Sequence, residues 1–167
     1  SESLKYLTNS VPCIIMSLNK ERQIVFQNKV LMELLEADSD QLILGKRPGE
    51  LFECVHSNKT PGGCGTTRFC SECGALEAIL ESWNEDKIAV NECRIITRNG
   101  RAYEFKVRAN KYSYSDKDFL IFSLVDISDE KRKDVLEKTF FHDINNILGV
   151  VQMYSGMIEQ EISDEKK

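Results

Sequence analysis

The chain has 167 residues, of which 41% are hydrophobic and 29% charged, a composition that suits one ordinary globular domain with an appendage. The formal net charge is −5 and no basic block offsets it, so we expect no nucleic-acid partner. The apolar runs are only a few residues long and the first residues do not form a signal peptide, so we expect no membrane contact in this chain.

The first part of the chain predicts short helices around a β-hairpin. A lead-in helix is expected at 2–9, and two β-rich strands at 11–18 and 23–26 are joined by a polar turn. Asn28 then precedes an apolar pattern typical of a helix and is expected to cap that helix. A second short helix is expected at 39–44, ended by a glycine.

The second part predicts a longer helix and three strands. The helix spans 74–83 and is expected to bury one side, formed by Leu76, Ile79, Leu80 and Trp83. The strands are expected at 87–97, 101–112 and 118–126, with a hairpin turn at Asn99-Gly100 between the first two. This order predicts an α+β fold, in which short helices cover one face of a five-stranded antiparallel sheet.

Three stretches of residues 1–128 resemble the PAS domain, a sensory module of signalling proteins. They are Asn28 at the end of the second strand, the segment 44–52 (LGKRPGELF), and Val125-Asp126-Ile127-Ser128. The last string is similar to the Asp-Ile-Thr ending that joins such domains to a signalling helix. Asp126 or Ser128 is expected to cap the helix that begins near residue 129.

Four cysteines cluster within 20 residues, in the pattern C-x9-C-x5-C-x2-C at Cys54, Cys64, Cys70 and Cys73. The glycines among them permit the sharp bends that bring several thiolates to one point. The segment 54–73 therefore predicts a closed four-thiolate metal site, which holds either Zn²⁺ or an iron–sulfur cluster.

Two other interpretations of the cysteine cluster stay open, a pair of disulfides and four free thiols without a site. His56 either replaces one ligand or is a loop histidine without a role. Cys13 and Cys93 lie in expected strands and are interpreted as small buried apolar residues. An iron–sulfur cluster would be redox-labile and make the site a sensor, whereas zinc would staple a glycine-rich loop.

A long C-terminal helix carries a narrow apolar seam, formed by Phe140, Ile144, Ile147, Val151, Tyr154 and Ile158. At about 100° per residue this is the seam of a coiled coil or helical bundle, and it predicts a homodimer through this helix. His142 lies on the other side of the helix, so we expect its imidazole to face water. A histidine that is partly unprotonated near neutral pH can act as a nucleophile.

The string His142-Asp143-Ile144-Asn145-Asn146-Ile147-Leu148 resembles the phosphoacceptor box of sensor histidine kinases. The resemblance implies that His142 is phosphorylated, that Asp143 is its acidic helper and that Asn146 serves the phosphatase reaction. Residues 129–167 would then be a signalling helix and the truncated first helix of the dimerisation and phosphotransfer domain.

The same resemblance implies a cytoplasmic two-component kinase whose full-length form binds ATP and Mg²⁺ on a separate domain. That protein would pass the phosphoryl group to an aspartate on the receiver domain of a response regulator. Both ends of the chain read as cuts from a longer protein, and we expect this part to be inactive alone. The alternative is a non-enzymatic redox-sensing or metal-sensing module whose C-terminal helix only dimerises or docks a partner.

Overall fold

The computed structural model describes residues 2–37 and 39–164, with the side chains of 3, 4, 150, 151 and 154–164 left aside. The chain divides into two compact units, Ser1–Ser128 and Asp129–Lys167. In the described part of the chain, no helix combines the length and the apolar character that crossing a membrane requires.

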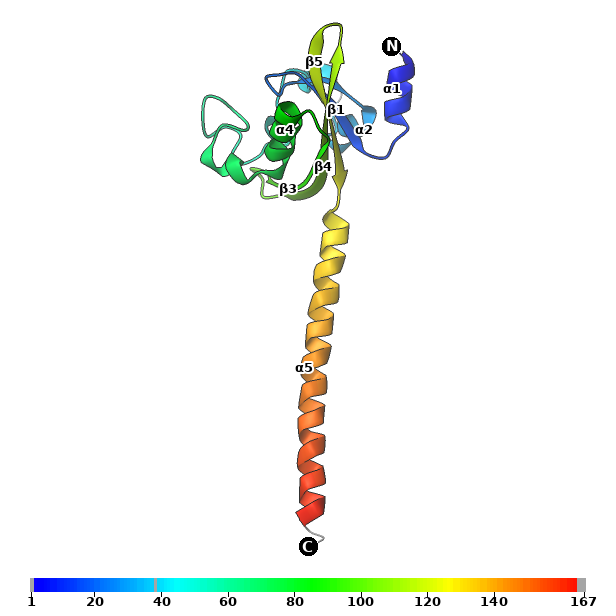
Figure 1. Cartoon of the computed structure of the whole chain (residues 1–167), viewed down its shortest axis with the longest axis vertical. Helices are drawn as coiled ribbons and strands as arrows, with labels where there is room; N and C mark the ends of the chain where they lie inside the picture. Colours follow the sequence, from blue (N-terminus) through cyan, green and yellow to red (C-terminus); the bar gives the residue numbers. More distant parts are fainter. Residues whose placement is uncertain (1, 38, 165–167) are drawn as a thin grey trace. The chain divides into compact units, whose positions relative to one another are not determined.

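The first unit is built on a five-stranded antiparallel sheet (Figure 1). Its strands are β1 (Ile14–Leu18), β2 (Ile24–Gln27), β3 (Ala89–Ile96), β4 (Ala102–Tyr114) and β5 (Lys117–Asp126). Their order across the sheet is β2-β1-β5-β4-β3, so the last strand lies in the middle between β1 and β4. The predicted five-stranded sheet is confirmed.

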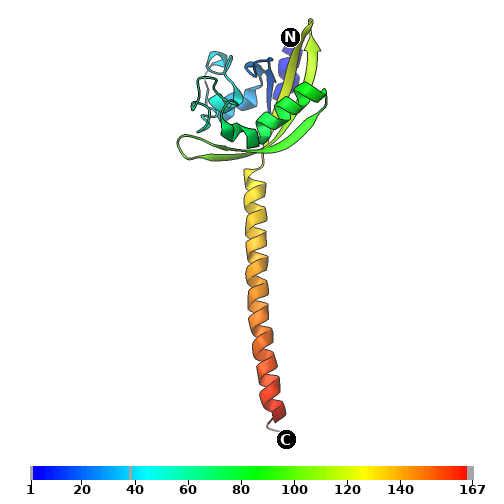
Figure 2. The same ribbon diagram turned by 60° about the vertical axis from the view of Figure 1, so that its left-hand side comes forward.

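Short helices and one longer helix cover one face of this sheet (Figure 2). Those between the hairpin and β3 are α2 (Lys29–Leu34), η1 (Asp40–Leu42), α3 (Pro48–Leu51), η2 (Arg68–Glu72) and α4 (Gly74–Glu85). The chain begins with α1 (Glu2–Asn9), as predicted. The core fills the space between the sheet and this layer, and its largest fully buried side chains include Phe105, Phe122, Met16 and Leu31.

The buried side of α4 differs from the prediction. Ala78, Ile79 and Ser82 are buried, whereas Leu80 is 43% exposed. Ser82 is tolerated at this position because its Oγ accepts a hydrogen bond from the backbone N–H of Lys111 on β4, at 3.1 Å. Small side chains at 78 and 82 let the helix lie closer to the sheet than a broad leucine face would.

Asn28 occupies the N-cap position of α2, but its side chain makes no capping hydrogen bond. Its Oδ1 accepts from the N–H of Ile15 at 3.0 Å, and its Nδ2 donates to the carbonyls of Thr8 at 2.9 Å and Cys13 at 2.8 Å. The capping role was therefore wrong: this asparagine, which is 1% exposed, joins the end of α1 to β1.

A single residue, Ile127, separates β5 from the helix α5 (Ser128–Asp164). Of the two expected caps, Asp126 is the one that binds the first N–H of the helix: its Oδ1 accepts a hydrogen bond from the N–H of Ser128 at 2.9 Å. The Ser128 hydroxyl instead accepts from the N–H of Glu104 on β4 at 3.2 Å. The backbone of Ile127 adds a bond to the Glu104 carbonyl at 2.8 Å, so the end of β5 is fixed to β4.

Candidate functional site

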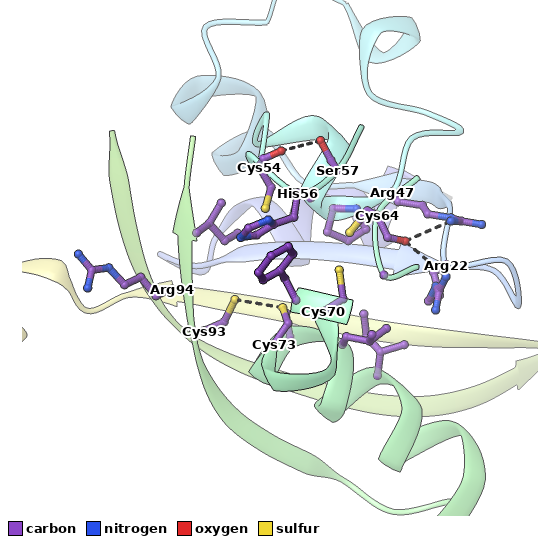
Figure 3. A pocket seen from close by; sticks show the side chains of 18 of the residues that line it. Arg22, Arg47, Cys54, His56, Ser57, Cys64, Cys70, Cys73, Cys93 and Arg94 are labelled. Carbon is purple, nitrogen blue, oxygen red and sulfur yellow. Dashed lines mark hydrogen bonds between the residues drawn. The ribbon is translucent and has the colours of Figure 1, made fainter. Parts of the chain in front are cut away.

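A cavity of about 580 Å³ lies between the cysteine-rich segment, α4 and the sheet (Figure 3). Its apolar lining comes from α4 and the sheet, through Ile79, Ile95, Phe122 and Leu124. Five thiols line the same cavity: Cys54, Cys64, Cys70, Cys73 and Cys93. The structure therefore brings all four cysteines of the predicted cluster to one cavity and adds a fifth.

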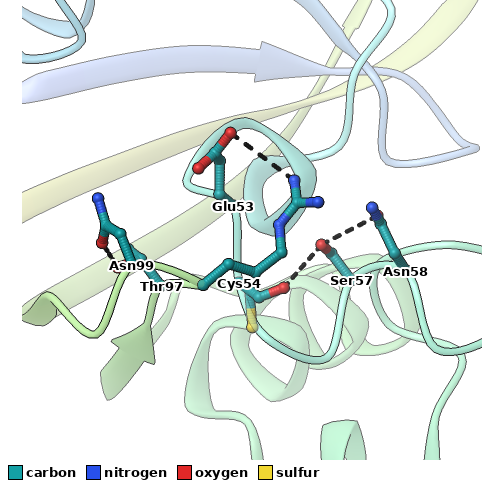
Figure 4. Close-up of polar contacts among 7 residues, drawn as sticks. Glu53, Cys54, Ser57, Asn58, Thr97 and Asn99 are labelled. Atoms are coloured by element: carbon teal, nitrogen blue, oxygen red, sulfur yellow. Dashed lines mark hydrogen bonds and ion pairs between the residues drawn. The ribbon is translucent and has the colours of Figure 1, made fainter.

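Cys54 is held beside the end of β3 (Figure 4). It pairs with Thr97 in an isolated antiparallel bridge, and the next residue, Val55, donates its N–H to the carbonyl of Ile96 at 2.9 Å. The Ser57 hydroxyl donates to the Cys54 carbonyl at 2.7 Å and closes the turn that follows. This backbone pairing anchors one wall of the cavity to the sheet.

Cys64 sits between two glycines in the left-handed region, Gly63 at φ 74° and Gly65 at φ 84°. Residues with a Cβ rarely adopt such backbone angles, so the expected role of glycine in bending this segment is confirmed. The Cys64 carbonyl accepts from Arg47 Nη1 at 3.1 Å and from Arg22 Nη2 at 3.4 Å. Two arginines thus fix the backbone that carries this thiol.

Cys70 and Cys73 come from η2 and from the start of α4. The N–H of Cys73 donates to the Cys70 carbonyl at 3.1 Å, and Cys73 is the N-cap residue of α4. The Cys70 sulfur lies 3.2 Å from the Thr67 hydroxyl. The two-residue spacing of this pair therefore spans the junction between a 3₁₀ turn and an α-helix.

Cys93 is buried as predicted, but the sequence did not indicate that it lies beside the cysteine cluster. It lies on β3, is 3% exposed, and its Sγ is 3.9 Å from the Sγ of Cys73. The signal was present in the strand pattern, because Ala89, Cys93 and Ile95 share the buried side of β3. Knowing that this side faces α4 would have placed Cys93 near the cluster.

The thiols differ in their ionisation. Burial is the main cause that raises the pKa of Cys64, to about 11. The pKa of Cys73 is lowered, first because the Cys93 thiol donates a hydrogen bond to it and then because the N–H groups of Leu76 and Ala75 point at its sulfur. The pKa of Cys93 is raised by the same hydrogen bond and by burial. Cys73 is therefore the thiol of this pair that ionises more readily.

All six cysteines of the chain are free thiols. Within residues 2–37 and 39–164, no three His, Cys, Asp or Glu side chains form a ready-made metal centre. The pair Cys73–Cys93 nevertheless has the separation of two ligands on one ion, since Zn–S bonds of ~2.3 Å at a tetrahedral angle put two sulfurs ~3.8 Å apart. The thiols of the cavity are of the type that binds Zn²⁺ or iron, but the cysteines across the cavity have to move towards this pair to complete a centre. The four-thiolate centre stays a prediction.

His56 also lines the cavity, where its ring stacks on Phe69 with centroids 4.6 Å apart. Its Nδ1 is buried and has no hydrogen-bond partner among the described residues. Lys59 and Arg68 each lie 4.9 Å from the centre of the Phe69 ring. The ring pair forms an aromatic wall of the cavity, and the part of His56 in metal binding stays open.

The second candidate site is a histidine motif on α5. The side chain of His142 is 74% exposed, and its Nδ1 lies 3.5 Å from Asp143 Oδ1 and 3.2 Å from Asn146 Nδ2. Both neighbours approach the same ring nitrogen, Nδ1, and neither contact involves Nε2. The three residues that the sequence grouped together are in contact, at a position that another domain can reach.

The apolar seam of α5 is exposed within its unit where the structure describes its side chains. Phe140 is 61% exposed, Ile144 37% and Ile147 63%. The side chains of the other seam residues, Val151, Tyr154 and Ile158, lie outside the described residues.

No family model and no curated protein matches the chain. The solved structures similar to it include the PAS domain of nitrogen regulation protein NR(II) from Vibrio parahaemolyticus, at 11% identity and a TM-score of 0.55, over 74% of this chain and 97% of that one. A PAS domain from a two-component sensor histidine kinase matches at 12% identity and a TM-score of 0.51, over 75% and 94%.

A third similar structure is the PAS domain of an HTR-like protein from Haloarcula marismortui. It matches at 18% identity and a TM-score of 0.51, over 75% of this chain and 90% of that one. At such identities the likeness concerns the fold alone, and the first unit has the PAS fold.

Proposed function

We propose that this chain is the sensory and phosphoacceptor part of a two-component sensor histidine kinase. The observation that carries the proposal is the exposed cluster of His142, Asp143 and Asn146 on the helix that follows a PAS fold. Two of the similar structures, a nitrogen regulation protein and a sensor histidine kinase, carry PAS domains, which supports this context. The parent protein is a cytoplasmic signalling enzyme whose ATP and Mg²⁺ bind to a separate domain.

The chemistry follows from the tautomer of His142. When Nδ1 carries the proton and donates it to the Asp143 carboxylate, the lone pair on Nε2 is free to attack phosphorus. The N–P bond forms as the bond from the γ-phosphorus of ATP to the oxygen of departing ADP breaks. Asp143 stabilises the positive charge that develops on the ring, and accepts the Nδ1 proton. The phosphoryl group then passes to an aspartate on the receiver domain of a response regulator.

The cysteine cavity is proposed as the sensory site, which holds Zn²⁺ or an iron–sulfur cluster through the thiols of the cluster. Support comes from the four cysteines of the pattern, which line one cavity although they come from separate turns of the chain. When bound, Zn²⁺ would crosslink the cysteine-rich segment, whereas an iron–sulfur cluster would supply a redox-active centre. Because a single residue separates α5 from β5, a change in packing over the sheet has a short path into the helix.

Homodimerisation through α5 completes the proposal. Phe140 and Ile147 are more than 60% exposed in a single chain, and a second copy of the helix would cover them. Light scattering on the chain should give twice the monomer mass. Replacing both residues by glutamate should give the monomer mass, and a monomeric unmodified chain would contradict this part of the proposal.

Phosphorylation in trans tests the kinase proposal. A histidine-kinase ATP-binding domain with labelled ATP should label the wild-type chain and the His56→Gln variant, the matched control at the only other histidine. It should not label His142→Gln. Equal labelling of His142→Gln would contradict the assignment of His142 as the phosphorylated residue. Absence of label from all three chains would favour the alternative, a non-enzymatic redox-sensing or metal-sensing module.

Elemental analysis with a visible spectrum tests the cavity proposal, on protein purified without oxygen. About one zinc per chain and no visible absorption would indicate a structural zinc site. Iron with sulfide and broad visible absorption would indicate a redox sensor. Metal-free wild-type protein that also fails to take up Zn²⁺ or iron with sulfide would contradict metal binding in either form.

A further inference from the structure

One thiol of the sequence cluster contacts a cysteine outside it. Cys73 at the start of α4 and Cys93 on β3 are 20 positions apart in the chain, and their sulfurs are 3.9 Å apart. We propose that Cys93 is a metal ligand of this cavity and shares one tetrahedral ion with Cys73. This inference rests on the proposed metal binding by the cavity and names a ligand outside the C-x9-C-x5-C-x2-C pattern.

The position of Cys73 relative to Cys93 is fixed by the contact of α4 with β3. A Cβ added at Gly74 would lie 2.0 Å from the backbone oxygen of Glu92. Only a glycine lets the first residue of α4 lie this close to the strand, and it stands directly between Cys73 and the rest of the helix. Cys93 in turn pairs with Phe105 inside a continuous β3–β4 ladder. Both thiols therefore sit on well-supported backbone.

The separation of this pair suits a shared ion better than a bond between the sulfurs. Two thiolates bound to one tetrahedral ion at ~2.3 Å lie ~3.8 Å apart, so Cys73 and Cys93 need almost no movement to bind it. A disulfide requires the sulfurs at ~2.05 Å, about half the present separation. Two thiolates on different irons of a larger cluster would lie farther apart, so the geometry favours one ion between these two sulfurs.

The remaining ligands would come from the opposite wall, which has to move towards the pair, since no three of the described side chains already form a metal centre. Cys54 and Cys64 lie across the cavity from the Cys73–Cys93 pair (Figure 3). The Cys70 sulfur already has a partner in the Thr67 hydroxyl at 3.2 Å. With Cys54 and Cys64, the pair makes a four-thiolate set, and Cys70 is the thiol left over.

The charges around the cavity agree with an anionic centre. An ion with two positive charges and four thiolates carries a net charge of −2. The described residues that line the cavity include a single carboxylate, Glu72, against four arginines: Arg22, Arg47, Arg68 and Arg94. Arg94 is already paired with Glu104 at 3.3 Å, and Glu50 accepts a hydrogen bond from the N–H of Cys64 at 3.2 Å. The remaining excess of positive side chains is small, and its sign favours a tetrathiolate centre.

Cadmium-113 NMR on the wild-type chain tests the proposal without any substitution. The reduced, metal-free protein is loaded with ¹¹³Cd²⁺, and couplings from the metal to cysteine β protons identify the ligands directly. We expect couplings to the β protons of both Cys73 and Cys93. Bound cadmium with couplings to other cysteines but none to Cys93 would overturn this inference and leave metal binding by the cavity intact. Failure to bind either Cd²⁺ or Zn²⁺ would overturn this inference and would limit the proposed metal binding to an iron–sulfur cluster.

A matched pair of variants gives a second, independent result. Cys93→Ala should weaken Zn²⁺ binding at least tenfold in a competition titration against a chromophoric chelator, because it removes a ligand. Cys13→Ala removes a thiol that does not line the cavity and should bind Zn²⁺ like the wild type. Equal affinities of the two variants would overturn the proposal. So would a mass loss of two hydrogens that maps to a Cys73–Cys93 disulfide in the zinc-treated wild type.

Discussion

Asn146 Nδ2 lies 3.2 Å from His142 Nδ1, the same ring nitrogen that Asp143 Oδ1 approaches at 3.5 Å. The two contacts need opposite tautomers of the ring. An amide N–H can only donate, so Asn146 needs an unprotonated Nδ1 and places the proton on Nε2. A carboxylate can only accept, so Asp143 needs the proton on Nδ1 and leaves the Nε2 lone pair free for attack.

Asn146→Ala should affect the loss of the phosphoryl group from His142 without preventing its attachment. The variant should still be labelled at His142, since Asp143 keeps its access to Nδ1. Loss of phosphate should slow about tenfold or more if, as proposed, the Asn146 amide positions a water near the ring. The measurement is the decay of labelled protein after removal of ATP. The neighbouring Asn145→Ala, also exposed, is the control and should decay like the wild type. Equal decay of both variants would remove Asn146 from the reaction.

Asp143→Asn should slow the labelling of His142. An amide can still approach Nδ1, but it does not stabilise the positive ring or accept its proton. We expect the initial rate of labelling to fall roughly a hundredfold, within the usual contribution of a positioned acid or base. Asp134→Asn removes the same charge from an exposed position of the same helix and should leave the rate within a factor of two. A similar rate for both variants would contradict the role of Asp143.

Local patterns in the sequence predicted most of the fold, and they grouped residues that the structure brings together at each candidate site. Alternation placed the strands, and the order of elements predicted the sheet, whose middle strand β5 is the last in the chain. The cysteines of the pattern are close in sequence, and glycines at 63 and 65 bend the chain between them. Cys93 was missed because its contact with Cys73 is tertiary: it depends on which face of β3 meets α4.

Asn28 shows the same limit for a polar residue. Its place before an apolar pattern is that of a helix cap, and local reasoning stops there. The structure uses both ends of the amide for contacts to Thr8, Cys13 and Ile15, on two other elements and the turn between them. Nothing in the residues around Asn28 indicates these partners, since they come together only when the hairpin forms.

Asn28→Ala should destabilise the sheet domain strongly. The substitution removes three hydrogen bonds, among them the one that the N–H of Ile15 on β1 donates to Asn28. We expect the free energy of unfolding to fall by about 2–4 kcal/mol. Urea denaturation followed by circular dichroism measures it. Asn84→Ala, at an exposed position of α4, is the control and should leave stability unchanged or slightly higher, since alanine is the better helix former. A loss below 1 kcal/mol for Asn28→Ala would contradict the proposed role.

Gly74→Ala tests the contact between α4 and β3. The added Cβ would meet the backbone oxygen of Glu92 at 2.0 Å, so the helix has to move away from the strand. We expect a loss of about 1–3 kcal/mol, as for other overpacked sites. Gly149→Ala adds the same methyl group in α5, where nothing lies within 4 Å of it, and should not lower the unfolding midpoint of the sheet domain. Equal stability of the two variants would show that α4 can move without cost.

The pH dependence of thiol alkylation tests the hydrogen bond between Cys93 and Cys73 in the metal-free protein. Only the thiolate reacts, so the rate at each cysteine rises with pH through its own pKa. Burial raises the pKa of Cys64 to about 11 and also raises that of Cys13, whereas donation from Cys93 lowers the pKa of Cys73. With iodoacetamide and peptide mass spectrometry, Cys73 should reach half its maximal rate at a lower pH than the other two. Cys93→Ala removes the donor and should move the Cys73 midpoint upward, towards the ordinary value of a thiol. A wild-type midpoint for Cys73 no lower than that for Cys13, or one that Cys93→Ala leaves in place, would contradict the hydrogen bond.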